Sequence, residues 1–387
     1  MKVLQLGKFF PLRGGVEKVM FALTEGLSGR GVDCDMLCAK FRRVPFDEED
    51  IPRSSRQGRL EVLTLGPHGR VLCARAWFKA AATMIAPYMI AWLRRHCNEY
   101  DIIHIHHPDP MAGLALRLSG YRGEVVLHWH SDIVSQRFFL RLYGPLQRWL
   151  IGRSRFVVGT TPVYVEQSPY LQGAKDKLAC IPIGCHALSC PQEAAAAFRR
   201  RFPAPHLVFS MGRLVPYKGF EYLVSAMEHL DGNYHLLLGG DGPMRAEMEK
   251  LIEEKGLQDR VSLAGYLEPE TVPLCFAGAD VFVMSSVMKS EAFGIVQIEA
   301  MSCGTPVVTT DVPGSGMSWV NAHGESGLVV SPRDPGALAD AIRRICEDPD
   351  QYARFARGAR SRHERLFSYN VMIDKTLQLY EKVNSDN

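Results

Sequence analysis

The sequence has no long hydrophobic run. Its 387 residues contain no stretch of the ~18 consecutive apolar residues that a membrane-spanning helix needs. The apolar part of its start, MKVLQLGKFF, is too short for a secretory signal peptide and is typical of a first β-strand. These absences argue against an exported or membrane-spanning chain, and we expect a cytoplasmic protein.

The sequence also lacks Cys-x2-Cys pairs, although it contains ten cysteines. The one sequence cluster, Cys180, Cys185 and Cys190 with His186 beside them, has spacings that match no common zinc pattern. We therefore expect reduced, mostly buried thiols and no metal centre.

A Gly-x-Gly-x-x-Gly fingerprint is missing as well. Gly14 and Gly15 follow the first apolar run, Val3–Leu6, without the spacing that dinucleotide-binding folds use. This absence argues against a nicotinamide-dependent dehydrogenase.

What the sequence does have is an uneven charge distribution. Up to Cys190 it holds 25 Lys and Arg against 16 Asp and Glu, and after Cys190 it holds 20 against 26. A basic first half indicates contact with an anionic surface or ligand. In that half the apolar segment Arg75–Arg95 carries Trp77, Phe78 and Trp92 among basic residues. Two interpretations remain open: an amphipathic patch on an anionic membrane, or an ordinary core-facing helix with a charged rim.

Apolar runs of strand length alternate with longer helical patterns along the chain. Strands are predicted at Val3–Leu6, Val32–Cys38, Ile102–Ile105, Val125–His128, Phe156–Gly159, Leu207–Met211, His235–Leu238, Val261–Leu263, Val281–Met284 and Pro306–Thr309. Helices fall between them, for example at Val16–Ser28, Phe220–Glu228 and Pro243–Lys255. Continuously apolar strands that alternate with helices are typical of parallel sheets in α/β proteins.

The series restarts once, after the segment Ser189–Pro205, which is rich in alanine, arginine and proline and indicates a linker. We therefore predict an α/β protein with two Rossmann-like doubly wound domains facing a central cleft. The domains would comprise residues 1–188 and 189–367, and a helix at about 368–387 would pack back on the first domain. Ligands of doubly wound sheets bind at the carboxyl ends of the strands, so the cleft would hold the site.

Two motifs of the first half follow predicted strands. Arg13–Glu17 contains paired glycines ahead of a helix, which suits either a phosphate at the helix N-terminus or a plain turn. Further on, His104, His106, His107 and Asp109 are expected at the mouth of the cleft. There they could bind an acceptor or a metal ion, or simply form polar surface.

Two motifs of the second half combine glycines with charge. Arg213 and Lys218 lie in a glycine-bearing loop after the strand Leu207–Met211 and could bracket a diphosphate, since Arg offers forked donors and Lys a point charge. Gly239–Pro243 follows the next strand and is explained equally well as a turn, with Pro243 at the first helical position.

Two carboxylates form the last motif. Glu291 lies in a loop ahead of a helix-like run, Val296–Met301, that carries Glu299. Together they could bind two sets of hydroxyls, one on a sugar and one on a ribose. Each alone would be explained as a solvent-exposed glutamate.

In their order and spacing these motifs resemble family 4 of the retaining glycosyltransferases, which have the GT-B fold. The resemblance covers essentially the whole chain and is most specific in the second half, at residues 212–219, 239–243, 291–299 and 304–308. In the first half it rests on Gly14, Gly15, Glu17, His130 and Asp132.

In the second half the resemblance implies a donor site. Its diphosphate would be held by Arg213 and Lys218, and its ribose hydroxyls by Glu299. The donor sugar would be bound by Glu291 and by the backbone of Phe293-Gly294.

In the first half the resemblance implies that Gly15 touches the diphosphate and that His130 lies beside the transferred sugar. The runs His130–Val134, Ser290–Gln297 and Trp319–Gly324 look like a narrower group that adds mannose or rhamnose to cell-surface polysaccharides. The usual donor of that group is a GDP-sugar, although no motif in the sequence reads the base.

The mechanism is inferred from a missing nucleophile. Double displacement needs a carboxylate beneath the sugar carbon, and the one candidate, Glu291, is already assigned to sugar hydroxyls. We therefore expect front-face attack, in which the leaving diphosphate is stabilised by Arg213, Lys218 and helix N-termini. No metal ion and no cofactor beyond the nucleotide-sugar co-substrate is expected.

The expected partners are a nucleotide-sugar donor, a lipid-linked or saccharide acceptor and an anionic surface on the inner membrane face, but no nucleic acid. Three alternatives stay open. The first is a UDP-sugar-dependent glycosyltransferase, and the second is a sugar-nucleotide epimerase of the same fold, which would need acid–base residues at the sugar's C2. The third is a non-catalytic protein with this fold, which would be expected to lose the motif set.

Overall fold

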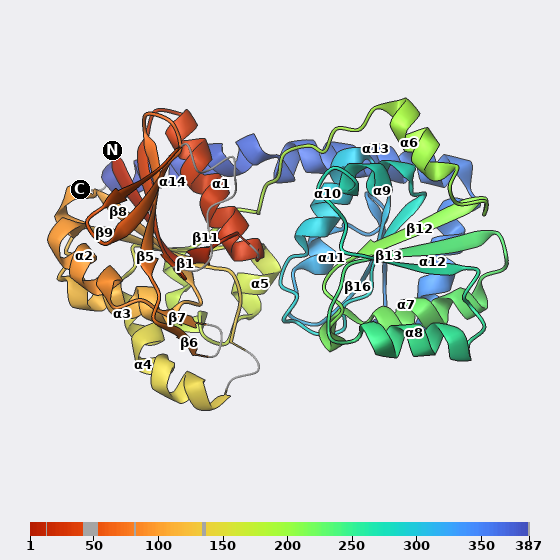
Figure 1. The fold of residues 1–387 in the computed structure, drawn as a ribbon, viewed down its shortest axis with the longest axis horizontal. Helices are drawn as coiled ribbons and strands as arrows, with labels where there is room; N and C mark the ends of the chain where they lie inside the picture. Colours follow the sequence, from red (N-terminus) through yellow and green to blue (C-terminus); the bar gives the residue numbers. More distant parts are fainter. Residues whose placement is uncertain (13, 42–52, 81–82, 134–136, 386–387) are drawn as a thin grey trace. The chain divides into compact units, whose positions relative to one another are not determined.

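The computed structural model describes residues 1–12, 14–41, 53–80, 83–133 and 137–385. Contacts divide the chain into two compact units, Met1–Ile183 with Met372–Asn387, and Gly184–Val371 (Figure 1). The chain enters the second unit ahead of the segment that the sequence suggested as the linker. The reason is that the backbone of Cys185 already pairs with the end of that unit. Cys185 and Ser368 form an isolated parallel β-bridge, and the Cys185 N–H donates to the carbonyl of Phe367.

The first unit is built on a nine-stranded sheet with the order β11-β10-β9-β8-β1-β2-β5-β4-β3. Neighbours from β11 to β5 are parallel, and β4 and β3 continue the sheet as antiparallel strands. The order reverses between β1 and β8, which is the topological switch point where doubly wound sheets bind ligands. The strands are β1 (Lys2–Phe10), β2 (Asp33–Lys40), β3 (Ser54–Gln57), β4 (Leu60–Thr64), β5 (Gly69–Arg75), β8 (Ile102–His107), β9 (Glu124–Trp129), β10 (Phe156–Gly159) and β11 (Leu178–Cys180).

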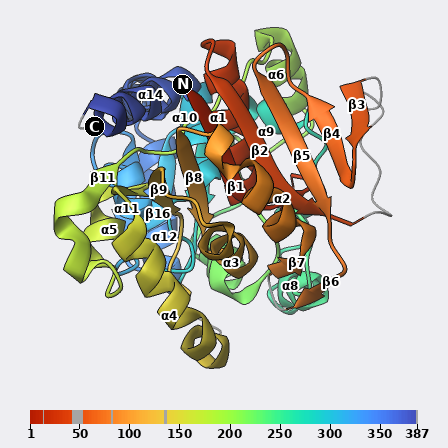
Figure 2. The ribbon, with the colours of Figure 1, turned by 90° about the vertical axis from the view of Figure 1, so that its left-hand side faces the viewer.

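Helices connect these strands, and the last helix of the chain returns to them. The α-helices are α1 (Gly15–Gly29), α2 (Tyr88–His96), α3 (Pro110–Ser119), α4 (Arg137–Arg153), α5 (Pro162–Gln167) and α14 (Tyr369–Ser385), with short helices η2 (Cys97–Glu99) and η3 (Gln172–Lys177). Figures 1 and 2 both show α14 beside the N-terminus. Its Tyr380 hydroxyl accepts a hydrogen bond from Gln5 of β1, so the two ends of the sequence share one core.

The second unit contains a six-stranded sheet, all parallel, with the order β14-β13-β12-β15-β16-β17. Its switch point lies between β12 and β15. The strands are β12 (His206–Met211), β13 (Tyr234–Gly239), β14 (Val261–Gly265), β15 (Val281–Met284), β16 (Val307–Thr310) and β17 (Gly327–Val330). The two Rossmann-like, doubly wound sheets predicted from the sequence are thereby confirmed.

Helices cover both faces of this second sheet. They are α6 (Gln192–Arg199), α7 (Phe220–Ala226), α8 (Arg245–Glu254), α9 (Val272–Gly278), α10 (Ile295–Cys303), α11 (Met317–Val320), α12 (Pro335–Cys346) and α13 (Pro349–Arg362), with short helices η4 (Pro216–Lys218), η5 (Met227–His229) and η6 (His363–Phe367). Val281 and Val283 share a core with α7 and α12 on one face, whereas Phe282 packs on Phe276 of α9 on the other. Burial on both faces explains why the strands are continuously apolar.

The segment Arg75–Arg95 is not one helix, so its interpretation as an ordinary core-facing helix was wrong. It forms the end of β5, the antiparallel strands β6 (Phe78–Ala80) and β7 (Thr83–Ile85), and then α2. A helix across the segment is prevented because Pro87 lacks the N–H that a helix interior uses, and the structure places it just before α2 begins. Only Met89 and Leu93 of α2 are buried.

The cysteines are less buried than the sequence suggested. All ten are free, and five of them, including Cys180, Cys185 and Cys190, are only partly buried. Cys180 ends β11 of the first unit, whereas Cys185 and Cys190 belong to the second.

Candidate functional site

The loop 212–219 follows β12 and so lies at the switch point of the second sheet. Buried Leu214 anchors the loop in a cluster with Phe220, Leu238 and Met248. The neighbouring loop after β13 packs directly on it, because a Cβ added to Gly240 would lie 1.9 Å from the carbonyl oxygen of Gly212. Glycines are therefore required here for backbone packing, which supports the interpretation of 239–243 as a turn.

One detail of that turn was predicted wrongly. Pro243 was expected at the first helical position, but α8 begins at Arg245. The backbone N–H of Met244 donates to the carbonyl of Leu214 instead, which keeps the turn against the loop 212–219 for one further residue.

An ion pair joins two of the predicted site residues. The Lys218 ammonium lies 2.6 Å from the Glu291 carboxylate, and the two side chains are only 12% and 15% exposed. Burial favours the neutral amine, but the adjacent carboxylate outweighs this effect, so the pKa of Lys218 is raised. The Lys218 ammonium is thus held charged, and the ion pair lies at the carboxyl ends of β12 and β15.

Tyr217 lies among the charged groups of this site. Burial and the Glu291 carboxylate raise the pKa of Tyr217, and the cations Lys218 and Arg213 oppose the increase. Arg213 itself is exposed to solvent. The structure therefore brings Lys218 and Glu291 into contact, and Arg213 lies near enough to oppose the increase in the pKa of Tyr217.

The N-terminus of α10 lies four residues after Glu291, at Ile295. Gly294 caps this helix with a φ of 78°, and a Cβ there would lie 2.6 Å from the Met284 side chain. Phe293 is buried and packs edge-on against Phe367, which fixes the turn. The first N–H groups of a helix have no helical partner, so they and the helix dipole favour an anion or a hydroxyl oxygen at this position. Glu299 lies further along α10 and is partly buried.

Two of the predicted site residues, Gly15 and His130, lie in the first unit. Gly14 caps α1 and Gly15 is its first residue, while the Glu17 carboxylate is buried beside Gly14. A carboxylate stabilises the positive end of its own helix. Arg13 lies outside the described residues, as does Val134 at the end of the predicted run His130–Val134.

His130 lies directly after β9, in a turn that is held by Asp132. The Asp132 carboxylate accepts hydrogen bonds from the Trp129 ring N–H at 3.0 Å and the Ser168 hydroxyl at 2.8 Å. The Asp132 N–H donates to the Tyr164 hydroxyl at 2.8 Å. The match of Asp132 to the family motif is therefore explained by its contacts: it fixes the backbone that presents His130.

The histidines of β8 were predicted wrongly. His104, His106 and His107 were expected at the mouth of a cleft, but they are part of β8 and are 0%, 0% and 1% exposed. The strand is longer than its apolar core suggested because these histidines pack face-on with other aromatic rings, as His107 does on Trp129 at 3.8 Å. Asp109 is also buried and instead caps α3 by accepting from the N–H groups of Met111 and Ala112.

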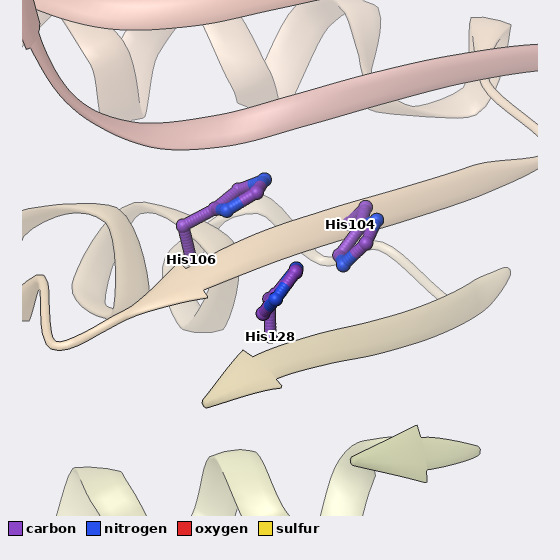
Figure 3. Close-up of side chains that lie close together, drawn as sticks. All are labelled: His104, His106 and His128. Carbon is purple, nitrogen blue, oxygen red and sulfur yellow. The ribbon is translucent and has the colours of Figure 1, made fainter. Parts of the chain in front are cut away.

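Among the described residues, one group of histidines has ring nitrogens close enough to suggest a metal ion. His104, His106 and His128 each offer a nitrogen within 4.8 Å of the others, and Figure 3 shows the first two on one strand and the third on its neighbour. Their rings are nearly parallel, with interplanar angles of 12° to 23°. Nitrogens around one zinc ion lie about 3.3 Å apart and use lone pairs in the ring plane. The stack would have to rotate apart to meet that geometry.

Sequence reasoning missed two residues near this stack, Gln5 and Tyr380. Gln5 is a polar residue inside the buried apolar run Val3–Leu6, and that mismatch was the available signal. Tyr380 gave no signal, because it reaches Gln5 from a position 375 residues away.

Comparison with known proteins defines the class. Residues 13–186 match the model of glycosyltransferase family 4, and residues 192–362 match the model of glycosyl transferases group 1. The structure aligns with sucrose-phosphate synthase of Thermosynechococcus elongatus over 100% of both chains, with a TM-score of 0.80 and 25% identity. It also aligns with Anabaena HepE in complex with UDP, with a TM-score of 0.80 and 20% identity over 99% of this chain and 100% of that one. The chain belongs to the family 4 glycosyltransferases and has the GT-B fold.

Two relatives match almost the whole chain. The O-antigen chain mannosyltransferase C of Escherichia coli is 29% identical over 384 residues, which cover 98% of both chains. The D-rhamnosyltransferase WbpZ of Pseudomonas aeruginosa is 29% identical over 357 residues, which cover 92% of this chain and 88% of the relative. Within the described residues, no helix is both long and apolar enough to cross a membrane.

Proposed function

We propose that this glycosyltransferase transfers a hexose to a lipid-linked or saccharide acceptor in cell-surface polysaccharide synthesis. The hexose is mannose or rhamnose, and its donor is a GDP-sugar. The observation that carries the donor site is the partly buried Lys218–Glu291 ion pair at the switch point of the second sheet. The mannosyl- and rhamnosyltransferase relatives support the sugar.

The proposed reaction retains the anomeric configuration. The acceptor oxygen forms its bond to the anomeric carbon on the face from which the diphosphate leaves, and the acceptor proton passes to the departing phosphate oxygen. Arg213, Lys218 and the N-terminus of α10 stabilise the charge that develops on the diphosphate, so no metal ion is needed. Glu291 binds sugar hydroxyls, Glu299 binds the ribose, and His130 and Gly15 contact sugar and diphosphate from the first unit.

The acceptor side of the proposal rests on a basic and aromatic surface of the first unit. Trp77 and Phe78 are 70% and 54% exposed, which is unusual for large aromatic side chains. A cavity of about 570 Å³ beside them is lined by Arg56, Arg59, Arg75, Trp77 and Tyr88, among others. Arginines with exposed aromatic rings suit the diphosphate and headgroups of a lipid-linked acceptor at an anionic membrane.

The test is to incubate purified protein with GDP- and UDP-linked sugars and a lipid-diphosphate saccharide, and to measure nucleotide release and the product by NMR. We expect turnover with a GDP-hexose and a product whose anomeric configuration matches the donor. Turnover with UDP-sugars alone would reject the donor assignment, and an inverted product would reject the mechanism. Conversion of the donor to its C2 epimer without an acceptor would identify an epimerase.

A further inference from the structure

A chain of hydrogen bonds runs from His130 into the core of the first unit. The His130 ring Nε2 lies 2.9 Å from Nδ1 of His106, and Nε2 of His106 lies 2.8 Å from the side-chain oxygen of Gln5. The Gln5 amide nitrogen donates to the Tyr380 hydroxyl at 3.0 Å, and this hydroxyl lies 2.6 Å from Nδ1 of His104. All five side chains are at most 5% exposed, so water does not compete for these bonds.

The chain of bonds has one polarity. Because the Gln5 oxygen can only accept, Nε2 of His106 must carry the proton, and Nδ1 of His106 must then accept. His130 therefore donates through Nε2. Burial and the neighbouring histidines lower the pKa of both rings well below the usual range, so each ring is neutral and carries a single N–H.

We propose that Gln5, His106 and Tyr380 are positioning residues that hold His130 in its Nε2–H tautomer, so that the Nδ1 lone pair accepts a hydrogen bond from a hydroxyl of the transferred sugar. The role of His130 beside the sugar rests on the proposed function, whereas the tautomer follows from the hydrogen bonds and the burial of the two rings. A sugar hydroxyl is a donor and an acceptor, but a ring nitrogen that carries a proton could not accept from it. The tautomer thus decides which hydroxyl orientation the enzyme binds.

Packing supports this assignment as well as hydrogen bonding. The His128 ring stacks on His130 at 4.0 Å with an interplanar angle of 8°, which prevents the His130 ring from tilting. Neither ring nitrogen of His128 has a hydrogen-bond partner among the described residues. His128 therefore restrains the plane of the His130 ring but not its proton, and this difference supplies a matched control.

The tautomer can be measured directly by ¹⁵N NMR of the full-length protein labelled at histidine, with His130→Asn used to assign the signals. We expect a protonated Nε2 and an unprotonated Nδ1 for His130 in the wild type. A protonated Nδ1 overturns the proposal. A metal ion bound by His106 also overturns the proposal, because the metal would occupy a ring nitrogen that the chain of hydrogen bonds needs. This measurement needs no transferase activity, so a failure of the proposed function would be recognised separately.

Two variants test the positioning role. Gln5→Met removes the acceptor of His106 at similar volume, and Tyr380→Phe removes the hydroxyl that orients Gln5. For each we expect a mixture of His130 tautomers and a fall in kcat of about tenfold, the value of one neutral hydrogen bond, with little change in nucleotide affinity. The control His128→Phe should keep the wild-type tautomer and transfer rate. A folded Gln5→Met or Tyr380→Phe protein with an unchanged tautomer, or with an unchanged kcat, overturns the positioning role.

Discussion

The ammonium of Lys218 lies 2.6 Å from the carboxylate of Glu291, although the two residues come from different loops of the second unit. Lys218 follows β12 and Glu291 follows β15, and these adjacent strands form the switch point of the sheet. The ion pair thus joins the side chain that we propose to bind the diphosphate to the one that we propose to bind sugar hydroxyls.

Replacement of Glu291 should separate transfer from nucleotide binding. For Glu291→Ala we expect transfer to fall by at least about a hundredfold, because the sugar loses its charged partner, while affinity for the free nucleotide largely survives. Calorimetric titration with GDP and a transfer assay measure the two effects. Glu299→Ala is the matched comparison and should weaken the affinity for the free nucleotide, since its proposed partner is the ribose. An equal loss of nucleotide affinity in Glu291→Ala would contradict its assignment.

Transfer should not depend on a divalent metal ion. We expect full activity in excess EDTA, because cationic side chains and the N-terminus of α10 stabilise the leaving diphosphate. Arg213→Ala should then impair turnover, and added Mg²⁺ should not rescue it. Activity that is lost in EDTA and restored only by Mg²⁺ or Mn²⁺ would reject this expectation.

The basic surface of the first unit should bind anionic vesicles. Each basic residue near such a surface contributes about 1 kcal/mol, screened over about 10 Å at 0.1 M salt, and Trp77 and Phe78 add an apolar part that salt weakens less. Sedimentation with vesicles should decrease as salt is added, and Arg94→Glu with Arg95→Glu should reduce it further. The control reverses two exposed charges of the second unit, Lys250→Glu and Arg357→Glu, and should bind as wild type. If wild-type protein ignores anionic vesicles at low salt, the membrane proposal fails.

Acid should destabilise the first unit through its buried histidines. Burial lowers the pKa of His128 to about 3, and burial is also the main cause that lowers the pKa of His107 to about 3. Between pH 6 and 3 the unfolded chain binds protons at these residues and the folded chain does not. Their contribution to the free energy of unfolding is therefore complete above pH 6.5 and falls with decreasing pH. Each such histidine contributes about 1.4 kcal/mol per pH unit to the slope of the unfolding free energy.

His128→Phe checks this slope, because phenylalanine keeps the stack but cannot be protonated. The pH dependence of its unfolding free energy, measured in urea, should be flatter than that of the wild type by about one histidine's contribution. Parallel curves for the two proteins would show that His128 is already charged in the folded state.

The sequence by itself predicted ten of the strands, the doubly wound class of both sheets and the residues that we propose for the donor site. Continuously apolar runs such as Val281–Met284 identify parallel strands because both of their faces are buried, and glycine-bearing loops mark where these strands end. The same pattern placed Arg213, Lys218, Glu291 and Glu299 after strands that lie next to one another. The sequence analysis did not predict β3, β4, β5, β6, β7, β11 or β17. All of these except β5 have five residues or fewer, and the polar strand β3 lacks the continuous apolar pattern.

Only the tertiary structure decided what the buried polar residues do. His104 and His106 look like surface, acceptor-binding or metal-binding residues in the sequence, but stacking and hydrogen bonds place them inside the first unit. Their partners come from opposite ends of the chain, Gln5 from β1 and Tyr380 from α14. Periodicity describes the neighbours of a residue along one element, whereas the cost of burying a polar group is offset by partners that the fold brings from elsewhere. The tautomer of His130 depends on those distant partners, and so it belongs to the fold and not to any local motif.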